Sequence, residues 1–183
     1  MKSSKKNILI VVFSVVFVSV IALGITVFGV NTDLIEASVY REKVFEVHLD
    51  NVSAITTGNA TYTLPRVEDT SLNDFYVQIS TNTDSVVYTF TIKNKGDYDA
   101  VLSSISKFNP DCSGSSITDN KDVCNNLVYK LTYNNGSKVK NGDILEAGTT
   151  RTMKLMIKTS SKNIITSPVL IKDLDIMLNY NKK

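Results

Sequence analysis

Histidine is nearly absent from this sequence, and its scarcity excludes several kinds of active site. The chain has one histidine, His48, in 183 residues. One histidine cannot supply a histidine pair or a His-Glu-x-x-His zinc motif, and it leaves no second choice of base for a Ser-His-Asp triad. His48 also falls on the polar side of an alternating stretch. We therefore expect a solvated strand residue there.

A basic surface field is also missing. The formal net charge is +2, but Lys2, Lys5 and Lys6 precede every acidic residue; without them, 17 of the 20 basic residues remain against 18 acidic ones. The chain has no glycine loop that could cradle a phosphate, and its tyrosines are not paired with arginines as a platform for stacked bases. The sequence predicts no nucleic-acid partner and no cofactor.

Paired catalytic carboxylates are not evident either. The acids are scattered over turns and exposed strand faces, which favours solvation over the acid and nucleophile of a glycosidase. One tract, "ITDNKDVC" with Asp119, Asn120 and Asp122, resembles a calcium loop but lacks the glycine and terminal glutamate of an EF-hand. We predict no catalytic residues, no metal site and no enzymatic activity, with a weak calcium site near Asp119 as an open alternative. The scattered acids are Glu46, Asp50, Glu68, Asp69, Asp74, Asp84, Asp97, Asp99, Asp111, Asp119, Asp122 and Glu146.

The N-terminus carries a long uncharged run. It extends over residues 8–30 after the three lysines, and a helix of that length, at about 1.5 Å per residue, could cross a bilayer core of about 30 Å. The positive-inside rule places the remainder of the chain on the outer side of the membrane. Residues 1–30 are therefore predicted to be a signal peptide or an uncleaved signal anchor, and both alternatives stay open. No cysteine lies near the end of the run, which excludes lipoprotein-type attachment.

Two cysteines, Cys112 and Cys124, lie in the polar loop "PDCSGSSITDNKDVCNN". An even pair in an exported chain is typical of a disulfide, with free thiols as the alternative. Closing so short a loop would stabilise the fold by roughly 3 kcal/mol in the loop-entropy description. Without nearby histidines, two such cysteines do not make a tetrahedral zinc set.

Beyond residue 44 the apolar residues alternate with polar ones at a period of two, which is typical of half-buried strands. The clearest example is "SVVYTFTIKNKGDYDA" from Ser85, in which Val86, Tyr88, Phe90 and Ile92 share one side. The other predicted inward sets are Phe45, Val47 and Leu49; Tyr62 and Leu64; Phe75, Val77 and Ile79; Leu127, Tyr129, Leu131 and Tyr133; Met153, Leu155 and Ile157; and Leu174, Ile176, Leu178 and Tyr180.

Clusters of glycine and asparagine separate these stretches and favour tight turns. No window outside the apolar run has a convincing helical period, so we predict eight or nine strands and an all-β fold. The alternating faces favour a two-layer antiparallel sandwich of the jelly-roll or immunoglobulin-like kind. The predicted organisation is a leader at 1–30, a stalk or extra first strand at 31–43, and a β-sandwich domain at 44–183.

Two strings resemble exported bacterial β-sandwich proteins. "DSVVYTFTIKNKGDYDA" at 84–100 is similar to a repeated strand-and-turn signature, and "GDILEAGTTRTMKLMIK" at 142–158 is similar to a later turn and strand of the same kind of domain. Together with the N-terminal apolar run, their order resembles the TasA and camelysin family of biofilm-matrix and spore-coat-associated proteins. The metallopeptidase activity described for camelysins is not implied, because the chain has no zinc motif.

This resemblance implies subunits that join into extracellular fibres by strand addition, in which an early strand of one subunit completes a sheet of the next. We expect the donor within residues 39–49, with Val39, Val44, Phe45, Val47 and Leu49 as its apolar positions. The predicted protein is an exported, membrane-tethered or secreted surface protein with a structural role in a matrix, coat or fibre. Its expected partners are the membrane, further copies of itself or other surface proteins. The alternative is a monomeric binding or adhesion module that presents loops such as 109–126.

Overall fold

The alternating stretch from Ser85 forms the central strand β6 (Ser85–Asn94) of a four-stranded sheet. The computed structural model describes residues 41–107 and 109–183. Its strands all belong to the unit Lys43–Lys183. The strand order of this first sheet, here called the β6 sheet, is β1 (Val47–Thr57), β6, β11 (Thr150–Thr159) and β9 (Leu127–Tyr133), and every pair is antiparallel. Strands β1 and β9 are thus its two edges.

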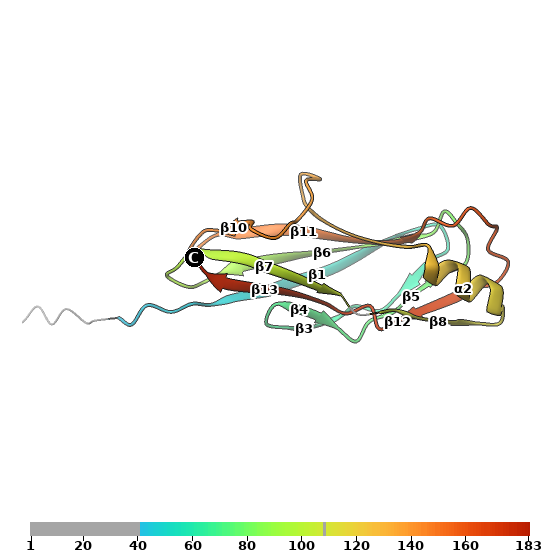
Figure 1. Ribbon diagram of the computed structural model, residues 1–183, viewed down its shortest axis with the longest axis horizontal. Coiled ribbons are helices and arrows are strands. Elements are labelled where there is room, and N and C mark those ends of the chain that lie inside the picture. Colours follow the sequence, from blue (N-terminus) through green and yellow to red (C-terminus); the bar gives the residue numbers. More distant parts are fainter. Residues whose placement is uncertain (1–40, 108) are drawn as a thin grey trace, which may run out of the picture. The chain divides into compact units, whose positions relative to one another are not determined.

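Two further antiparallel sheets complete the unit (Figure 1). In the β13 sheet the order is β10 (Ile144–Leu145), β7 (Ala100–Lys107), β13 (Ile176–Lys182), β4 (Ser71–Asn73) and β3 (Arg66–Glu68). In the β12 sheet it is β2 (Thr61–Tyr62), β5 (Val77–Ile79), β12 (Val169–Lys172) and β8 (Asp111–Gly114).

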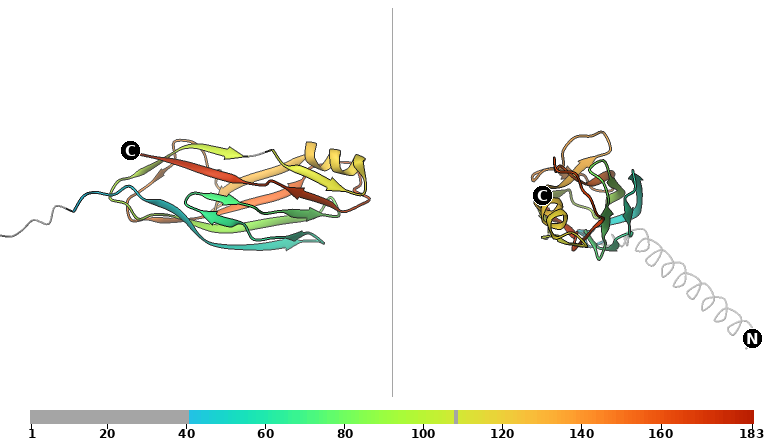
Figure 2. Two further views of the ribbon diagram at one scale, coloured as in Figure 1. Left: turned by 90° about the horizontal axis from the view of Figure 1, so that it is seen from below. Right: turned by 90° about the vertical axis from the view of Figure 1, so that its right-hand side faces the viewer.

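One hydrophobic core joins the three sheets. The end-on view in Figure 2 shows the strands arranged around a single interior. Inward side chains of the β6 sheet, such as Phe90 and Leu155, belong to the same buried cluster as Leu178 of the β13 sheet and Ile171 of the β12 sheet. All four are fully buried, and each such side chain stabilises the fold by about 1.5–3 kcal/mol.

The alternation predicted these inward faces correctly for the long strands. Val86, Tyr88, Phe90 and Ile92 in β6 have no exposed surface, and neither have Met153, Leu155 and Ile157 in β11 or Ile176 and Leu178 in β13. The all-β, sandwich-like fold is confirmed. The predicted bridge between Cys112 and Cys124 is also confirmed, and it ties β8 to the one helix among the described residues.

That helix, α2 (Ile117–Asn125), corrects the expectation of a plain loop between the cysteines. The hydroxyl of Ser116 accepts a hydrogen bond from the backbone N–H of Asp119, which caps the first turn. Only Asp119 and Val123 of the helix are buried. A helix that buries so few apolar side chains leaves no apolar period in the sequence, so the pattern did not reveal it.

Two other expectations were wrong. The described residues form thirteen strands rather than eight or nine, because several short strands of two to four residues flank the long ones. Tyr62 and Leu64 were expected on a buried face, but they are 37% and 54% exposed. Tyr62 ends β2, which is an edge strand of the β12 sheet, and Leu64 lies two residues beyond it.

The predicted leader, the stalk up to residue 40 and Val39 lie outside the described residues. Within 41–107 and 109–183, no helix has the length and apolar character needed to cross a membrane.

Candidate functional site

A groove of about 430 Å³ lies between the start of β1 and the end of β13. One wall comes from the segment that leads into β1, the other from the last residues of β13, and the turn between β3 and β4 supplies the floor. The lining residues are Phe45, Glu46, Val47, Asp69, Thr70, Asn179, Tyr180 and Asn181.

The turn between β6 and β7 holds the β1 wall in place. The backbone N–H of Asp97 donates to the carbonyl oxygen of Val44 at 2.7 Å, and the N–H of Val44 donates to Oδ2 of Asp97 at 2.9 Å. The N–H groups of Lys95 and Gly96 both donate to the carbonyl oxygen of Glu46, at 2.9 and 3.2 Å. Residues 44–46 are therefore fixed by backbone contacts.

The turn itself depends on Gly96 and Asn94. A Cβ atom at Gly96 would lie 2.6 Å from the carbonyl oxygen of Val44 and 2.7 Å from the nitrogen of Glu46, so only glycine allows this close approach. The side chain of Asn94 is fully buried; its Nδ2 donates to the carbonyl oxygens of Tyr98 and Leu145, and its Oδ1 accepts from the N–H of Gly96. The Asn-Lys-Gly-Asp string thus shapes one wall of the groove.

The backbone of this wall faces the groove. The carbonyl of Glu46 points to the β6–β7 turn, whereas the N–H of Leu49 points the other way and donates to the carbonyl oxygen of Asp69 at 2.6 Å. Successive residues of an extended chain point their backbone groups in opposite directions. The N–H and C=O groups of Phe45 and Val47 therefore point away from β6 and toward the groove.

The opposite wall also has a free backbone edge. Strand β13 pairs with β7 over its whole length, but with β4 only at Ile176 and Met177. The N–H of Leu178 still reaches the carbonyl oxygen of Thr70 at 2.9 Å. By the same alternation, the backbone groups of Tyr180 and Lys182 point away from β7 beyond the end of the β3–β4 hairpin. Tyr180 lines the groove, and Lys182 lies just beyond its lining residues.

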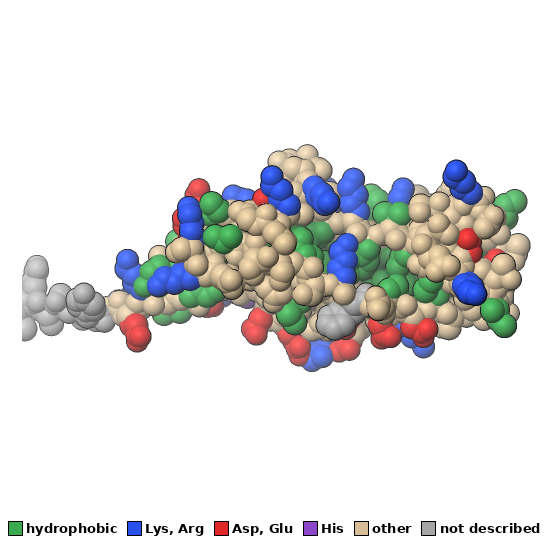
Figure 3. Space-filling model, in the orientation of Figure 1, with side chains coloured by type: hydrophobic (Ala, Val, Ile, Leu, Met, Phe, Trp, Pro, Cys, Tyr) green, Lys and Arg blue, Asp and Glu red, His purple; other side chains and the backbone are tan. Residues whose placement is uncertain are grey.

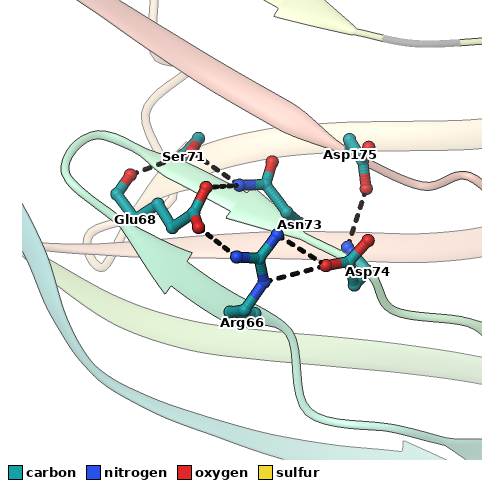
Figure 4. A network of polar contacts seen from close by, with 6 residues as sticks. All are labelled: Arg66, Glu68, Ser71, Asn73, Asp74 and Asp175. Carbon is teal, nitrogen blue, oxygen red and sulfur yellow. Dashed lines mark hydrogen bonds and ion pairs between the residues drawn. The ribbon is translucent and has the colours of Figure 1, made fainter.

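The β3–β4 hairpin is braced by a polar network (Figure 4). The guanidinium of Arg66 donates from Nε to Oδ2 of Asp74 at 2.8 Å and also contacts Glu68. Glu68 accepts from Nδ2 of Asn73, and Oδ1 of Asp175 accepts from the N–H of Asp74 at 3.0 Å. These contacts fix the floor of the groove relative to the segment just before β13.

The groove has the chemistry of a peptide-binding edge rather than of a reaction centre. Its side chains are two carboxylates, a threonine hydroxyl, two asparagine amides, one tyrosine and two apolar residues, Phe45 and Val47. Burial, and then the neighbouring Tyr133, raise the pKa of Tyr180, which keeps its hydroxyl protonated. Free N–H and C=O groups on both walls could bind an added extended segment.

The predicted donor residues that the structure describes lie partly before β1 and partly within it. Val44 and Phe45 precede β1 and belong to the groove wall; they are 46% and 38% exposed. Val47 and Leu49 are part of β1, where they pair with Asn94 and Ile92 of the same chain. In this structure those two positions complete the chain's own β6 sheet.

The other candidate positions have structural roles. His48 lies in β1 with Nδ1 3.7 Å from Oε1 of Glu46. Oδ2 of Asp119 accepts hydrogen bonds from the N–H and hydroxyl of Thr166 and from the N–H of Ser167, and these bonds hold the 160–168 loop against α2. Asp122 contacts Ser161 and Asn163 of the same loop. The described part of the chain contains no cluster of metal-ligating side chains.

Sequence reasoning missed Tyr180 and Lys182 as parts of a site. The position of Tyr180 in an alternating strand indicated burial, but nothing in the sequence indicated that the neighbouring β4 ends early. The signal that did exist was Gly96 in the Asn-Lys-Gly-Asp turn, which marks a close backbone approach.

No family model and no curated protein matches this chain. A solved structure with partial likeness is the envelope protein VP37 of White Spot Syndrome Virus, which has 8% sequence identity and a TM-score of 0.25. The match covers 69% of this chain and 98% of that protein. A likeness at this score supports no conclusion about the function of this chain.

Proposed function

We propose that this chain is an exported bacterial surface protein with a structural role, a subunit of a matrix, coat or fibre that joins neighbouring subunits by strand addition at the β1–β13 groove. The observation that carries the proposal is the pair of free backbone edges, Phe45 and Val47 on one wall, and Tyr180 with the adjoining Lys182 on the other. The N-terminal apolar run supports an outward-facing location, either tethered as a signal anchor or secreted after cleavage.

The finer architecture we propose is a jelly-roll or immunoglobulin-like sandwich preceded by a membrane-inserting helix, in the manner of the TasA and camelysin family. Within this proposal the donor comes from residues 39–49. Because Val47 and Leu49 already pair with β6, donating them would require β1 to leave its own sheet. Donation of the residues before Val44 would leave the β1–β6 pairing intact.

The test is a backbone-specific change at Lys182 in the full chain, purified in a mild detergent. Lys182→Pro removes an N–H that points away from β7 at the end of the β13 wall, whereas Lys182→Ala removes only the side chain and serves as the matched control. We expect the wild-type chain and Lys182→Ala to assemble and to exchange subunits in mixed-label experiments, and Lys182→Pro to assemble far less. Equal assembly by all three chains, or a wild-type chain that stays monomeric at high concentration, would refute strand addition at this groove.

A monomeric binding or adhesion module is the second candidate, and one observation favours it. Ile117 at the start of α2 and Ile164 in the loop that Asp119 holds are 83% and 82% exposed, although the disulfide and the Asp119 contacts fix both segments. Exposed apolar side chains held in place in this way can form part of a docking surface where they make a contiguous patch. A monomeric wild-type chain that loses adhesion after Ile117→Ser and Ile164→Ser would favour this function over assembly.

A further inference from the structure

The surfaces at the two edges of the β6 sheet carry opposite charge. Strands β9 and β11, at one edge, hold four basic residues and no acidic one: Lys130, Arg151, Lys154 and Lys158. At the other edge, β1 and the adjoining segment 66–74 hold four acids against a single arginine, Arg66: Asp50, Glu68, Asp69 and Asp74. Strand β6, between the edges, contributes only Lys93. We call these the basic edge and the acidic edge.

Figure 3 shows the same separation on the surface. Lys and Arg side chains gather over β11 along the upper rim, and several Asp and Glu side chains gather below β3 and β4 along the lower rim. The two rims belong to the same unit and lie on opposite sides of it.

The lysines of the basic edge are close together and lack counter-charges. Met156 of β11 lies directly opposite Lys130 of β9. Lys154 and Lys158 are therefore the two diagonal neighbours of Lys130 across the β9–β11 ladder. None of these three lysines forms an ion pair with any described residue. Like charges at this spacing repel one another, and an acidic partner would relieve that repulsion.

The acidic edge keeps uncompensated negative charge. Arg66 compensates Glu68 and Asp74, with Nη2 2.7 Å from Oδ2 of Asp74 (Figure 4). Asp50 and Asp69 take part in no ion pair among the described residues, and Asp50 is exposed. The net charge of this edge is therefore negative even after its internal pairs are counted.

Beyond Val47, some backbone groups along these two edges already have partners within the chain. At β1, the N–H of Leu49 donates to Asp69, and the carbonyl oxygen of Ala54 accepts from the hydroxyl of Tyr62 at 3.2 Å. At β9, the carbonyl oxygen of Tyr129 accepts from Nζ of Lys107 at 3.0 Å. The residues after β9 turn back, and the N–H of Val139 donates to the carbonyl oxygen of Leu131 at 3.4 Å.

We infer that the basic edge of one copy docks side by side against the acidic edge of a second copy through side-chain charge. The contact uses two different surfaces of the same molecule, so each copy keeps one free edge and the array stays open to further copies. It is separate from strand addition at the β1–β13 groove, because it needs no free backbone group. It also predicts a strong dependence on salt, which strand addition does not.

The first test is sedimentation velocity on the full chain in a non-ionic detergent, at about 0.01 M and at about 1 M salt, where the screening length falls from about 30 Å to about 3 Å. We expect concentration-dependent association at low salt and its loss at high salt. A chain that stays monomeric at low salt overturns the inference. If such a monomeric chain binds inorganic polyphosphate, the basic edge binds a polyanion and not a second copy, and the inference is overturned as well.

The second test reverses each edge. Variant one carries Lys130→Glu, Lys154→Glu and Lys158→Glu; variant two carries Asp50→Lys, Ser53→Lys and Glu68→Gln. Each variant alone should need a concentration about tenfold higher or more to associate, because both of its edges have the same sign.

Mixing the two variants should restore association, because every contact between them joins opposite charges. Circular dichroism of each variant controls for folding, and restoration in the mixture also requires that both are folded. Undiminished association of either variant alone, or no restoration in the mixture of two folded variants, overturns the inference. Lys182→Pro, which disrupts the groove, should leave the salt-sensitive association intact, so the two proposals fail independently.

Discussion

Val44 and Asp97 exchange two hydrogen bonds, one between their backbones at 2.7 Å and one from the N–H of Val44 to the Asp97 carboxylate at 2.9 Å. This pair fixes the segment that leads into β1. We predict that Asp97→Ala destabilises the fold by about 1 kcal/mol, since it removes one hydrogen bond to an exposed segment. Hydrogen exchange should show faster exchange at the amide of Val44 and unchanged exchange at Leu155 in the core. Unchanged protection at Val44 would show that the carboxylate does not hold the segment.

Substitution of Gly96 should displace the same segment, the one that leads into β1, by steric contact. Gly96→Ala places a Cβ atom about 2.6 Å from the carbonyl oxygen of Val44, and we expect a loss of about 1–3 kcal/mol as the wall moves away. Gly136→Ala is the matched control, because that glycine has φ +83° and no atom within 4 Å of the added Cβ. Its cost should be limited to the backbone strain of about 1–2 kcal/mol. Urea unfolding measures both, and displacement of the wall should appear as chemical-shift changes at Val44 and Glu46 in the Gly96 variant alone.

Asp84 should make stability depend on acid pH. The residue is 1% exposed, and its carboxylate accepts hydrogen bonds from the N–H groups of Asn59, Ser80 and Thr81 and from the Thr81 hydroxyl. Burial by itself would raise the pKa of Asp84, but these hydrogen bonds outweigh it, and the pKa is lowered from 3.8. A lowered folded-state pKa means that the stabilisation is present above the ordinary value and is lost as the pH falls through the folded-state value.

We therefore predict that Asp84→Asn loses about 2–3 kcal/mol at neutral pH, because an amide cannot accept all four hydrogen bonds. The difference between the wild-type chain and this variant should begin to shrink below about pH 4, where the carboxyl of the unfolded chain becomes protonated, and should be lost once the folded-state carboxyl is protonated as well. Urea unfolding between pH 7 and pH 3 measures this gap. Asp50→Asn, at an exposed position, should show little change at either pH. A gap for Asp84→Asn that stays constant with pH would contradict this account.

The disulfide should contribute mainly to the stability of the β8–α2 region. Replacing Cys112 and Cys124 by serine should lower the free energy of unfolding by roughly 3 kcal/mol, because the bridge closes a loop of 12 residues. The wild-type chain with a reductant should unfold at the same urea concentration as the double variant without it. If the reduced wild-type chain kept its full stability, the bridge would have no such role.

The sequence by itself determined the strands with a long regular alternation and the cysteine pair. In β6 and β11, inward and outward residues alternate without interruption, and burial of one face is then dictated by the geometry of a strand. The pairing of Cys112 with Cys124 followed because the chain offers no other cysteine. The resemblance to exported matrix proteins and the membrane leader remain predictions.

Only the tertiary structure decided which strands are neighbours, and the candidate surfaces depend on that. The groove exists because β4 ends after two pairs with β13 while β1 begins nearby; no local pattern in β13 encodes the length of β4. The helix α2 is held by Ser116, by Asp119 contacts with Thr166 and by the disulfide rather than by an apolar stripe. The basic edge likewise arises from the order β1-β6-β11-β9, and the acidic edge arises where β1 of that sheet adjoins the β3–β4 hairpin of the β13 sheet. Alternation is a local property of one strand, whereas edges and grooves are properties of strand order.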